Sequence, residues 1–338
     1  MKLLITGGGT GGHLAIAKSL RDAAIKDGHK CVFVGSTSGQ DEKWFKDDKE
    51  FKEVHFLKTS GVVNKKGLSK IASLFLTIKA TIKAISFVRK VDAVISVGGF
   101  SAAPASFASV LLRKPFFIHE QNAAIGRLNR LLKPYAKEFF SSYEETSTIK
   151  DYPVRQSFFD LARSRKDIKN IIFLGGSQGA RFINELAIKI APLLKEKKIN
   201  IIHQAGVLEL DKVKQEYKDL DIVADVFAFR NDIDELMQKS DLAVSRSGAS
   251  TLWELSASNL PALYIPYPYA AGDHQFYNAT FLLEKEASWL KRQDENPYEF
   301  LVKLLDKNLE NMSKNLKTLI QPNGAQMIIK KVEKCLKN

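Results

Sequence analysis

Short runs of apolar, often β-branched residues recur along the chain, separated by segments in which apolar residues return every three or four positions. The runs are Leu3–Thr6, Cys31–Val34, Ala93–Val97, Phe116–His119, Glu138–Ser141, Asn170–Leu174, Asn200–Gln204, Leu242–Ser245 and Ala262–Ile265. Runs of this length are typical of strands buried on both faces, and the intervening period is typical of helices. The alternation predicts an α/β fold with parallel sheets.

The order of strand, glycines and helix occurs twice, once near the start of each half. Lys2–Thr6 leads into Gly7–Gly12, and Asn170–Leu174 leads into Gly175–Ala180. A chain of 338 residues suits two domains, and Pro153 stiffens an extended connection between the halves. We therefore predict an N-terminal domain over 1–153 and a C-terminal domain over 154–322. The basic helical segment at about 323–338 either ends the second domain or packs back on the first.

The composition is that of a globular protein with a strong positive charge. Lys and Arg exceed Asp and Glu by 13, which predicts an anionic partner: nucleic acid, a phosphorylated substrate or an anionic membrane surface. The two cysteines, Cys31 and Cys335, are expected to be unpaired thiols in a reducing compartment. The sequence has no CxxC motif and no His/Cys cluster with metal-ligand spacing.

Two apolar stretches could be mistaken for membrane or secretion signals. Leu3–Ile5 is too short for the apolar core of a signal peptide. Ala93–Leu112 has 20 residues without a charge, the length of a membrane span, but it contains two glycines, four serines and a proline. We interpret it as a buried strand, a tight turn and a helix.

The two glycine turns suggest phosphate binding. A strand that ends in glycines and opens a helix presents unpaired N–H groups and the positive end of the helix dipole to an anion. Gly7, Gly9 and Gly12 fit the dinucleotide fingerprint, but the strand over Cys31–Val34 ends in Gly35-Ser36 instead of the acidic residue that a nicotinamide enzyme needs. His13 follows the first turn at once, where a titratable group can take part in chemistry.

Four further segments accompany these turns. They are Gly98–Pro104, His119–Ala123, Ser245–Thr251 and Asp273–Ala279. In order and spacing the six motifs resemble the MurG family of bacterial transferases, in glycosyltransferase family 28, over nearly the whole chain. The resemblance implies two Rossmann-like domains facing a cleft (the GT-B fold). It also implies transfer of N-acetylglucosamine from UDP-N-acetylglucosamine to undecaprenyl-diphosphate-linked muramyl-pentapeptide (lipid I) in peptidoglycan synthesis, and with it a part in cell-wall biogenesis, cell shape and division.

In the C-terminal domain, the resemblance implies a set of UDP-N-acetylglucosamine contacts. Ser177 and the glycines beside it would hold the diphosphate, Glu254 the ribose hydroxyls, and Gln275, with His274 beside it, the sugar hydroxyls. Phe229-Arg230 falls near the family's uracil-contacting backbone. The full set for this domain is Arg155, Ser177, Ala249, Ser250, Thr251, Leu252, Trp253, Glu254 and Gln275.

In the N-terminal domain, Thr10, Gly11, Gly12 and Asn122 would complete the donor site, and the glycine turn would also suit the acceptor's diphosphate. His13 resembles the family's candidate general base, with Glu120 and His119 as alternatives. The family has several residues, including a proline, between this histidine and the next helical run, whereas here His13 is followed directly by Leu14. The first helix is therefore expected to be shorter or to begin differently. Tyr152 also replaces the family's usual asparagine before Pro-Val-Arg.

The implied reaction is a single displacement with inversion at the sugar. It needs a base for the C4 hydroxyl of the acceptor, for which an imidazole is suited near neutral pH. It also needs charge stabilisation on the departing UDP, which backbone donors and a helix dipole can supply. None of the six motifs contains an Asp-x-Asp pair that would hold a catalytic cation. We predict no bound metal and no obligatory cofactor.

A basic segment suggests a membrane-facing surface. Between Lys58 and Lys90 there are eight basic residues and no acidic one. Ile71, Phe75, Ile78, Ile82 and Ile85 recur at helical spacing, which predicts that they face the core, with Leu68, Leu74 and Leu76 left over. Val110-Leu111-Leu112 before Arg113-Lys114 is a similar combination. Apolar residues among lysines suit an anionic leaflet, although a solvated basic helix gives the same pattern. With the resemblance, this predicts a peripheral protein on the cytoplasmic face of the cell membrane.

Other functions fit the same pattern less well. Another GT-B sugar-nucleotide enzyme, such as a glycolipid transferase or an epimerase, remains the nearest alternative. A nucleic-acid-binding function would account for the net positive charge, but the sequence has no basic strand with interspersed aromatic residues and no zinc module to support that function. A nicotinamide oxidoreductase is disfavoured by the missing ribose carboxylate.

Overall fold

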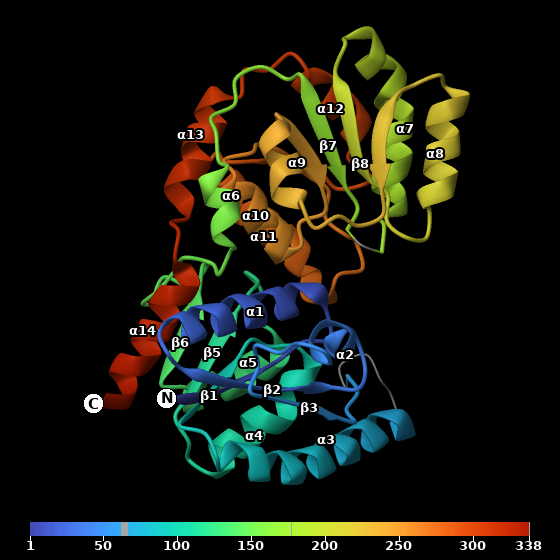
Figure 1. Ribbon diagram of the computed structural model, residues 1–338. Helices are drawn as coiled ribbons and strands as arrows, with labels where there is room; N and C mark the ends of the chain where they lie inside the picture. Colours follow the sequence, from blue (N-terminus) through green and yellow to red (C-terminus); the bar gives the residue numbers. More distant parts are fainter. Residues whose placement is uncertain (62–66, 177, 338) are drawn as a thin grey trace. The chain divides into compact units, whose positions relative to one another are not determined.

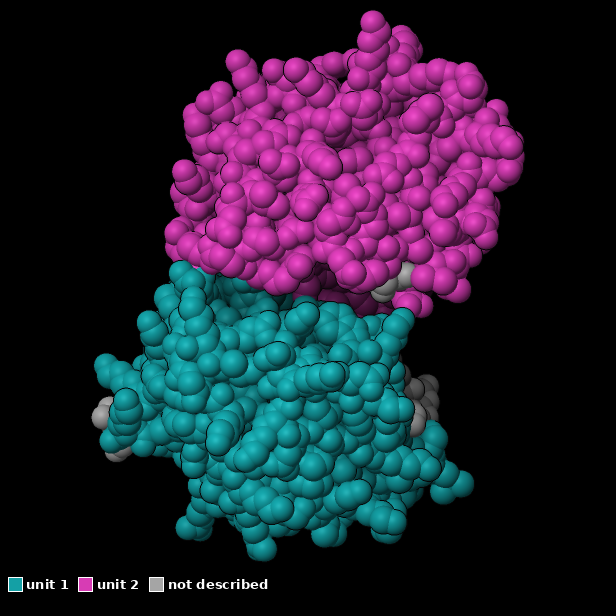
Figure 2. Space-filling model, in the orientation of Figure 1, with its two compact units in different colours: residues 1–154, 323–338 teal, residues 155–322 magenta. Residues whose placement is uncertain are grey.

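The computed structural model describes residues 1–61, 67–176 and 178–337 (Figure 1). The chain divides into two compact units, which Figure 2 colours separately. Unit 1 comprises residues 1–154 and 323–338, and unit 2 comprises residues 155–322.

Unit 1 contains a six-stranded sheet in which every pairing is parallel, in the order β3-β2-β1-β4-β5-β6. Its elements are β1 (Lys2–Thr6), α1 (Gly11–Lys26), β2 (Lys30–Ser36), α2 (Asp41–Phe45), β3 (Glu53–Leu57), α3 (Gly67–Val88), β4 (Ala93–Ser96), η1 (Phe100–Ala102), α4 (Ala103–Leu111), β5 (Phe116–Glu120), α5 (Arg127–Leu132), η2 (Lys133–Tyr135), β6 (Glu138–Ser141) and α14 (Gly324–Lys337). On one face of the sheet, Leu4, Val32 and Val94 pack with Ala84 of α3 and Ala108 of α4 in a single buried cluster.

Unit 2 repeats this architecture with a second parallel sheet, in the order β12-β11-β10-β7-β8-β9. Its elements are α6 (Gln156–Asp160), β7 (Asn170–Leu174), α7 (Arg181–Glu196), β8 (Asn200–Gln204), α8 (Leu210–Asp219), β9 (Ala224–Phe227), α9 (Ile233–Lys239), β10 (Leu242–Ser245), α10 (Ala249–Ala257), β11 (Ala262–Tyr264), η3 (Ala271–Asp273), α11 (His274–Leu283), β12 (Trp289–Leu290), α12 (Pro297–Leu304) and α13 (Glu310–Leu319). Ile171 and Phe173 of the central strand pack with Ile190 of α7 and Leu304 of α12.

The predicted α/β class with two Rossmann-like parallel-sheet halves is confirmed, and all nine predicted strands are present to within two residues at either end. The sequence pattern does not predict β3, β9 and β12, each of which is an edge strand. β3 and β9 carry Glu53, His55 and Asp225, because a strand paired on one side only can place polar side chains toward solvent. The uncharged stretch Ala93–Leu112 forms β4, η1 and α4, as predicted.

The last helix, α14, belongs to unit 1, although it follows unit 2 in the sequence. It packs along α1 with Ile328, Ile329 and Val332 fully buried. Glu333 Oε1 lies 2.7 Å from His29 Nε2, and Lys331 Nζ lies 2.9 Å from Glu138 Oε1. Of the two alternatives for this segment, the structure therefore has the helix that packs back on the first half.

Helix α3 presents its large apolar residues to solvent, so the predicted burial of that stripe is wrong. Ile71, Phe75, Ile78 and Ile82 are 58–69% exposed, and Ile85 is partly exposed. The buried positions of α3 are instead Ser73, Ala80, Thr81, Ala84 and Val88. These mostly small side chains let α3 lie close against α4 (Figure 1), and a stripe of small residues has the same helical period as the apolar one. By length and composition α3 is also apolar enough to cross a membrane.

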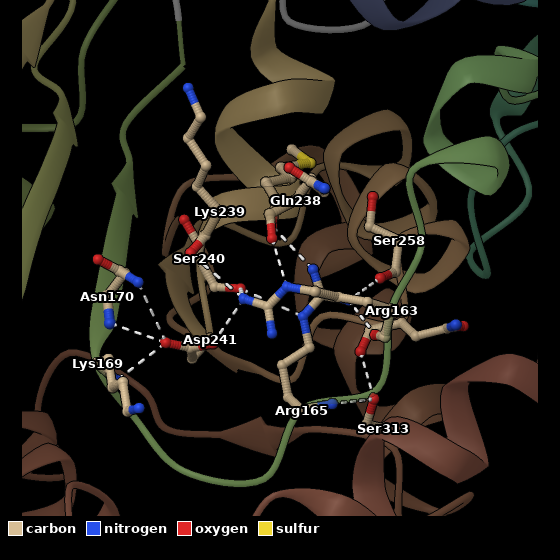
Figure 3. A network of polar contacts seen from close by, with 12 residues as sticks. Arg163, Arg165, Lys169, Asn170, Gln238, Lys239, Ser240, Asp241, Ser258 and Ser313 are labelled. Atoms are coloured by element: carbon tan, nitrogen blue, oxygen red, sulfur yellow. Dashed lines mark hydrogen bonds and ion pairs between the residues drawn. The ribbon is translucent and has the colours of Figure 1, made fainter.

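Two arginines of unit 2 hold the ends of two helices (Figure 3). Arg165, only 1% exposed, donates to the carbonyls of Met237 at 2.9 Å and Ser240 at 3.2 Å, and also to that of Ser258. Arg163 donates to the Gln238 carbonyl at 2.6 Å. These carbonyls belong to or directly follow the last turns of α9 and α10, where a cation is stabilised by the helix dipole.

Asp241 completes this network. Its Oδ1 lies 2.6 Å from Arg163 Nη2, and its Oδ2 accepts hydrogen bonds from the backbone N–H groups of Lys169 and Asn170, each at 2.9 Å (Figure 3). The start of β7 is therefore tied to the same cluster as the ends of α9 and α10.

Replacing Arg165 should destabilise unit 2. In Arg165→Ala, buried carbonyls at two helix ends lose their donors, so we expect the free energy of unfolding to fall by about 3 kcal/mol. Denaturant unfolding followed by circular dichroism measures this, with Arg89→Ala, at an exposed site in unit 1, as the control. A change below about 0.5 kcal/mol would show that the network contributes little to stability.

Candidate active site

The first glycine turn is shaped by direct contact between two backbones. Gly8 N–H donates to the carbonyl of Gly98 at 3.2 Å. A Cβ atom on Gly99, whose φ is +81°, would lie 2.2 Å from the Gly8 carbonyl oxygen. Only glycine allows this approach, which brings the loop after β4 against the turn between β1 and α1.

Asp41, at the start of α2, fixes the same turn from a third side. Its side chain is fully buried, and it accepts hydrogen bonds from the N–H groups of Gly9 at 2.5 Å and Ser36 at 2.9 Å. Desolvation raises the pKa of this carboxyl above its usual value, and the two backbone donors oppose the shift. The role of Asp41 is not predicted from the sequence, since nothing in its local pattern distinguishes it from a surface aspartate.

His13 lies in the first turn of α1, because the helix begins at Gly11. Its Nδ1 lies 2.8 Å from Thr10 Oγ1, and its Nε2 lies 3.0 Å from Gln121 Nε2. A carboxamide nitrogen can only donate, so with this amide orientation Nε2 of the imidazole is an acceptor and Nδ1 carries the proton toward Thr10. Gln121 was part of a motif noted in the sequence but was not among the predicted site residues.

The two alternative bases, Glu120 and His119, are buried at the end of β5. Glu120 Oε2 accepts hydrogen bonds from Gly126 N–H and Asn129 Nδ2, each at 2.9 Å, and Oε1 accepts one from Asn122 N–H at 3.0 Å. Burial raises the pKa of Glu120 and lowers that of His119 to about 3. Both oxygens of Glu120 therefore hold the loop that follows β5, and His119 is neutral at physiological pH.

The second glycine turn is built in the same way in unit 2. Gly206, with φ +80°, approaches so closely that a Cβ atom there would lie 2.1 Å from the backbone nitrogen of Gly179. Asn184 of α7 donates to the Ala205 carbonyl at 3.1 Å. The first turn of α7 is thereby tied to the loop that follows β8.

A pocket of about 680 Å³ opens beside this turn. It lies within unit 2, and the starts of α7 and α10 both contribute to its wall. It is lined by Leu174, Gly175, Gly176, Gly179, Ala180, Arg181, Phe182, Glu185, Ser245, Arg246, Gly248, Thr251, Tyr267, Pro268, Tyr269, Gln275 and Gln293. Arg181 pairs with Glu185 at 2.7 Å. Two helix N-termini and Arg246 around one cavity favour an anionic ligand.

Arg246 is anchored at the edge of the pocket. Its Nη1 donates to the carbonyls of Ile265 at 2.9 Å and Pro266 at 3.0 Å, and desolvation lowers its pKa to about 10. Its guanidinium carbon lies 5.7 Å from the centre of the Tyr267 ring. Arg246 belongs to a motif noted in the sequence, whereas Tyr267 and Tyr269 carried no sequence signal beyond their nearness to Gln275.

The predicted donor-site residues of α10 differ in their surroundings. Leu252 and Trp253 are buried in the core, and Ala249 is 5% exposed. Thr251 lines the pocket. One turn further, burial raises the pKa of Glu254 to about 7 against the opposing charge of Arg155.

The structure brings several of the other predicted residues together within each unit. In unit 1, the side chains of Thr10 and His13 are in contact. The backbone N–H of Asn122 donates to the Glu120 carboxylate. In unit 2, Gln275 and Thr251 line one pocket. Ser177 lies outside the described residues. Phe229 is 62% exposed, and Arg230 pairs with Asp225 at 3.0 Å.

Known families and curated relatives match both units. The glycosyltransferase family 28 N-terminal domain matches residues 3–141, and the C-terminal domain of that family matches residues 170–335. The UDP-N-acetylglucosamine–N-acetylmuramyl-(pentapeptide) pyrophosphoryl-undecaprenol N-acetylglucosamine transferase of Sulfurovum sp. is 50% identical over 330 residues, 97% of each chain. The enzyme of the same name from Campylobacter jejuni is 51% identical over 98% of this chain and 97% of its own.

Solved structures agree with these matches. MurG of Acinetobacter baumannii has a TM-score of 0.80 and 27% identity, covering 98% of this chain and 99% of its own. A UDP-GlcNAc 2-epimerase from Neisseria meningitidis shares the fold with a TM-score of 0.64 at 14% identity, over the full length of both chains. With both family domains matched and half of its residues shared with curated relatives, the chain belongs to glycosyltransferase family 28.

Proposed function

We propose that this chain transfers N-acetylglucosamine from UDP-N-acetylglucosamine to the C4 hydroxyl of the muramyl residue of lipid I, giving lipid II with inversion at the transferred sugar. Relatives that carry the name of this activity share about half of its residues over nearly the whole chain. The observation that carries the proposal is the unit 2 pocket, where a glycine turn and a second helix N-terminus meet beside Gln275.

The pocket is suited to a diphosphate. Gly176 and Gly179 precede α7, and Gly248 is the residue before α10, so backbone N–H groups from both helices can point at phosphate oxygens. Arg246 adds positive charge nearby, whereas Arg181 is paired with Glu185 at 2.7 Å. We infer that the UDP diphosphate binds here, with Glu254 accepting the ribose hydroxyls, Arg155 beside it, and Gln275 meeting the hexose.

His13 is the proposed general base. Its contacts with Thr10 and Gln121 orient the ring, with the proton on Nδ1. The C4 hydroxyl of the acceptor would displace the Gln121 amide from Nε2 and give its proton to that nitrogen. The attacking oxygen then forms a bond to the anomeric carbon as the bond to UDP breaks. Thr10, Gly11 and Gly12 would face the phosphates of a substrate at the helix N-terminus.

Glu120 is better suited to positioning than to proton transfer. Both carboxylate oxygens are occupied by donors from the following loop, which carries Gln121 and Asn122. The charge on the departing UDP can be stabilised by backbone donors and arginines that are already oriented. We therefore propose a reaction without an obligatory metal or cofactor.

The exposed face of α3 is proposed to lie on an anionic membrane. Ile71, Phe75, Ile78 and Ile82 project from it, and Lys70, Lys79 and Lys83 are exposed on the same helix. An apolar stripe among lysines on a long helix is typical of an interfacial surface. Lys65 and Lys66 belong to the same basic segment of the sequence but lie outside the described residues. The lipid-linked acceptor would then be reached from the cytoplasmic face of the membrane.

Transfer of labelled N-acetylglucosamine to a lipid I analogue tests the activity. In His13→Ala we expect kcat to fall by about 10²- to 10⁴-fold, because the base is lost while donor binding is kept. In Glu254→Ala we expect mainly a higher KM for the donor. His55→Ala is the control, since His55 packs on Phe87 away from the glycine turn. Full activity in His13→Ala would remove His13 as the base.

Donor binding should depend on pH through Glu254. The carboxyl ionises as pH rises through about 7, and the ionised form accepts both ribose hydroxyls. Affinity for UDP-N-acetylglucosamine, measured by calorimetry, should therefore rise about tenfold from pH 6 to pH 8, whereas Glu254→Gln should show a flat profile.

Stability of the unliganded protein should show the opposite trend. Folding favours neutral Glu254, so this contribution to stability is complete below the unfolded pKa of 4.5 and is lost as pH rises to about 7. Profiles of binding and melting temperature that are the same in wild type and Glu254→Gln would contradict the assignment.

Binding to liposomes that contain anionic lipid tests the α3 surface. Replacing Lys70, Lys79 and Lys83 with Glu should weaken binding by about a hundredfold or more, at about 1 kcal/mol for each basic residue, and added salt should weaken wild-type binding. Replacing Ile71, Phe75 and Ile78 with Ser should weaken it at all salt concentrations. Replacing the exposed Lys214, Lys218 and Lys303 of unit 2 with Glu is the control of equal charge, and an equal loss there would reject a specific surface.

A further inference from the structure

The segment that follows β11 is stiff and carries two tyrosines. Its sequence, Ile265 to Ala270, alternates proline and tyrosine. Ala270 N–H donates to the Tyr267 carbonyl at 3.2 Å, closing a turn whose second residue is Pro268. Because proline fixes φ, this turn loses little conformational freedom when a ligand binds.

Two side chains anchor the segment to the pocket. Arg246 holds the carbonyls of Ile265 and Pro266. Tyr267 N–H donates to Gln275 Oε1 at 2.9 Å. Since a backbone N–H needs an acceptor, this bond fixes the orientation of the Gln275 carboxamide and directs its Nε2 donor elsewhere.

Both rings line the pocket while remaining open to solvent. Tyr269 is 83% exposed and Tyr267 is 45% exposed. Their centroids lie 5.6 Å apart at an interplanar angle of 74°, so the edge of one ring meets the face of the other. An aromatic ring that is held in place yet left this exposed at a pocket is a surface that a ligand can cover.

The chemistry of this wall fits a pyranose ring. The C–H groups on one face of a hexose pack on an aromatic ring, and its hydroxyls need donors and acceptors such as the Gln275 carboxamide. The position agrees with the proposed donor site. Gly248 and Thr251 line the pocket, whereas Glu254, assigned to the ribose, lies one turn further along α10 and is not among the described residues that line it. The residue assigned to the ribose is therefore distinct from the wall that carries the two tyrosines.

We propose that Tyr269, supported by Tyr267, is a sugar-stacking platform that contributes to recognition of the hexose of the nucleotide-sugar donor. This inference rests on the proposed function and assigns two specificity-determining residues to its pocket. The platform binds the transferred sugar and leaves the nucleotide to the glycine turn and α10.

Calorimetry with two ligands, UDP and UDP-N-acetylglucosamine, separates the sugar contact from the nucleotide contact. In Tyr269→Ala, affinity for UDP-N-acetylglucosamine should fall about tenfold while affinity for UDP changes less than about twofold. Tyr269→Phe keeps the ring and should keep both affinities. Tyr135→Ala, at another exposed tyrosine, in unit 1, is the control, and a melting curve checks that each variant is folded.

Four outcomes would overturn the proposal. If Tyr269→Ala lost affinity equally for both ligands, the ring would contact the nucleotide. If its affinity for both ligands were unchanged, the ring would contact neither of them. Loss in Tyr269→Phe equal to that in Tyr269→Ala would assign the effect to the hydroxyl instead of the ring. Wild-type protein that bound neither ligand would overturn the proposed function and this inference with it, whereas the first three outcomes leave the proposed function intact.

Discussion

In each half of the chain, two loops at the carboxyl edge of a parallel sheet contact each other through the backbone atoms of glycines, and the site geometry depends on this contact. Gly99 meets Gly8 in unit 1, and Gly206 meets Gly179 in unit 2. Parallel strands place all their outgoing loops at one edge, so such contacts decide where the following helices begin. The N-termini of α1 and α7, and every candidate residue beside them, take their positions from this approach.

Buried charges then hold these loops without blocking them. Asp41 and Glu120 each accept backbone N–H groups from loops next to the first turn, and burial raises the pKa of both. In unit 2 a cation has the corresponding role. Arg165 donates to the Ser258 carbonyl at the C-terminal end of α10, and the first turn of α10 lines the pocket. Groups fixed in this way need little reorganisation when charge develops on a ligand, which is how preorganised sites stabilise transition states.

The sequence was sufficient where one physical signal dominated. Central strands such as Asn170–Leu174 are buried on both faces and read as continuous apolar runs, and glycine turns stand out because so few residues can replace them. The fold class and the motifs that surround the pocket follow from these signals. Edge strands such as β3 were not predicted, because a strand that is paired on one side only can carry polar residues such as Glu53.

Other features needed three-dimensional packing. The helical period of Phe75 and Ile78 identified α3 but not its buried face, since Ala80 and Ala84 form an equally regular stripe of small residues. Burying the small stripe brings the helix closer to its neighbour and leaves the large residues outside. The roles of Tyr269 and Asp41 could be inferred only from the residues that surround them in the structure. The burial of α14 in unit 1 also bears on how the protein is made. Ile328 and its neighbours are synthesised after the whole of unit 2, so the packing of unit 1 can be completed only after every residue of unit 2 has been added to the chain.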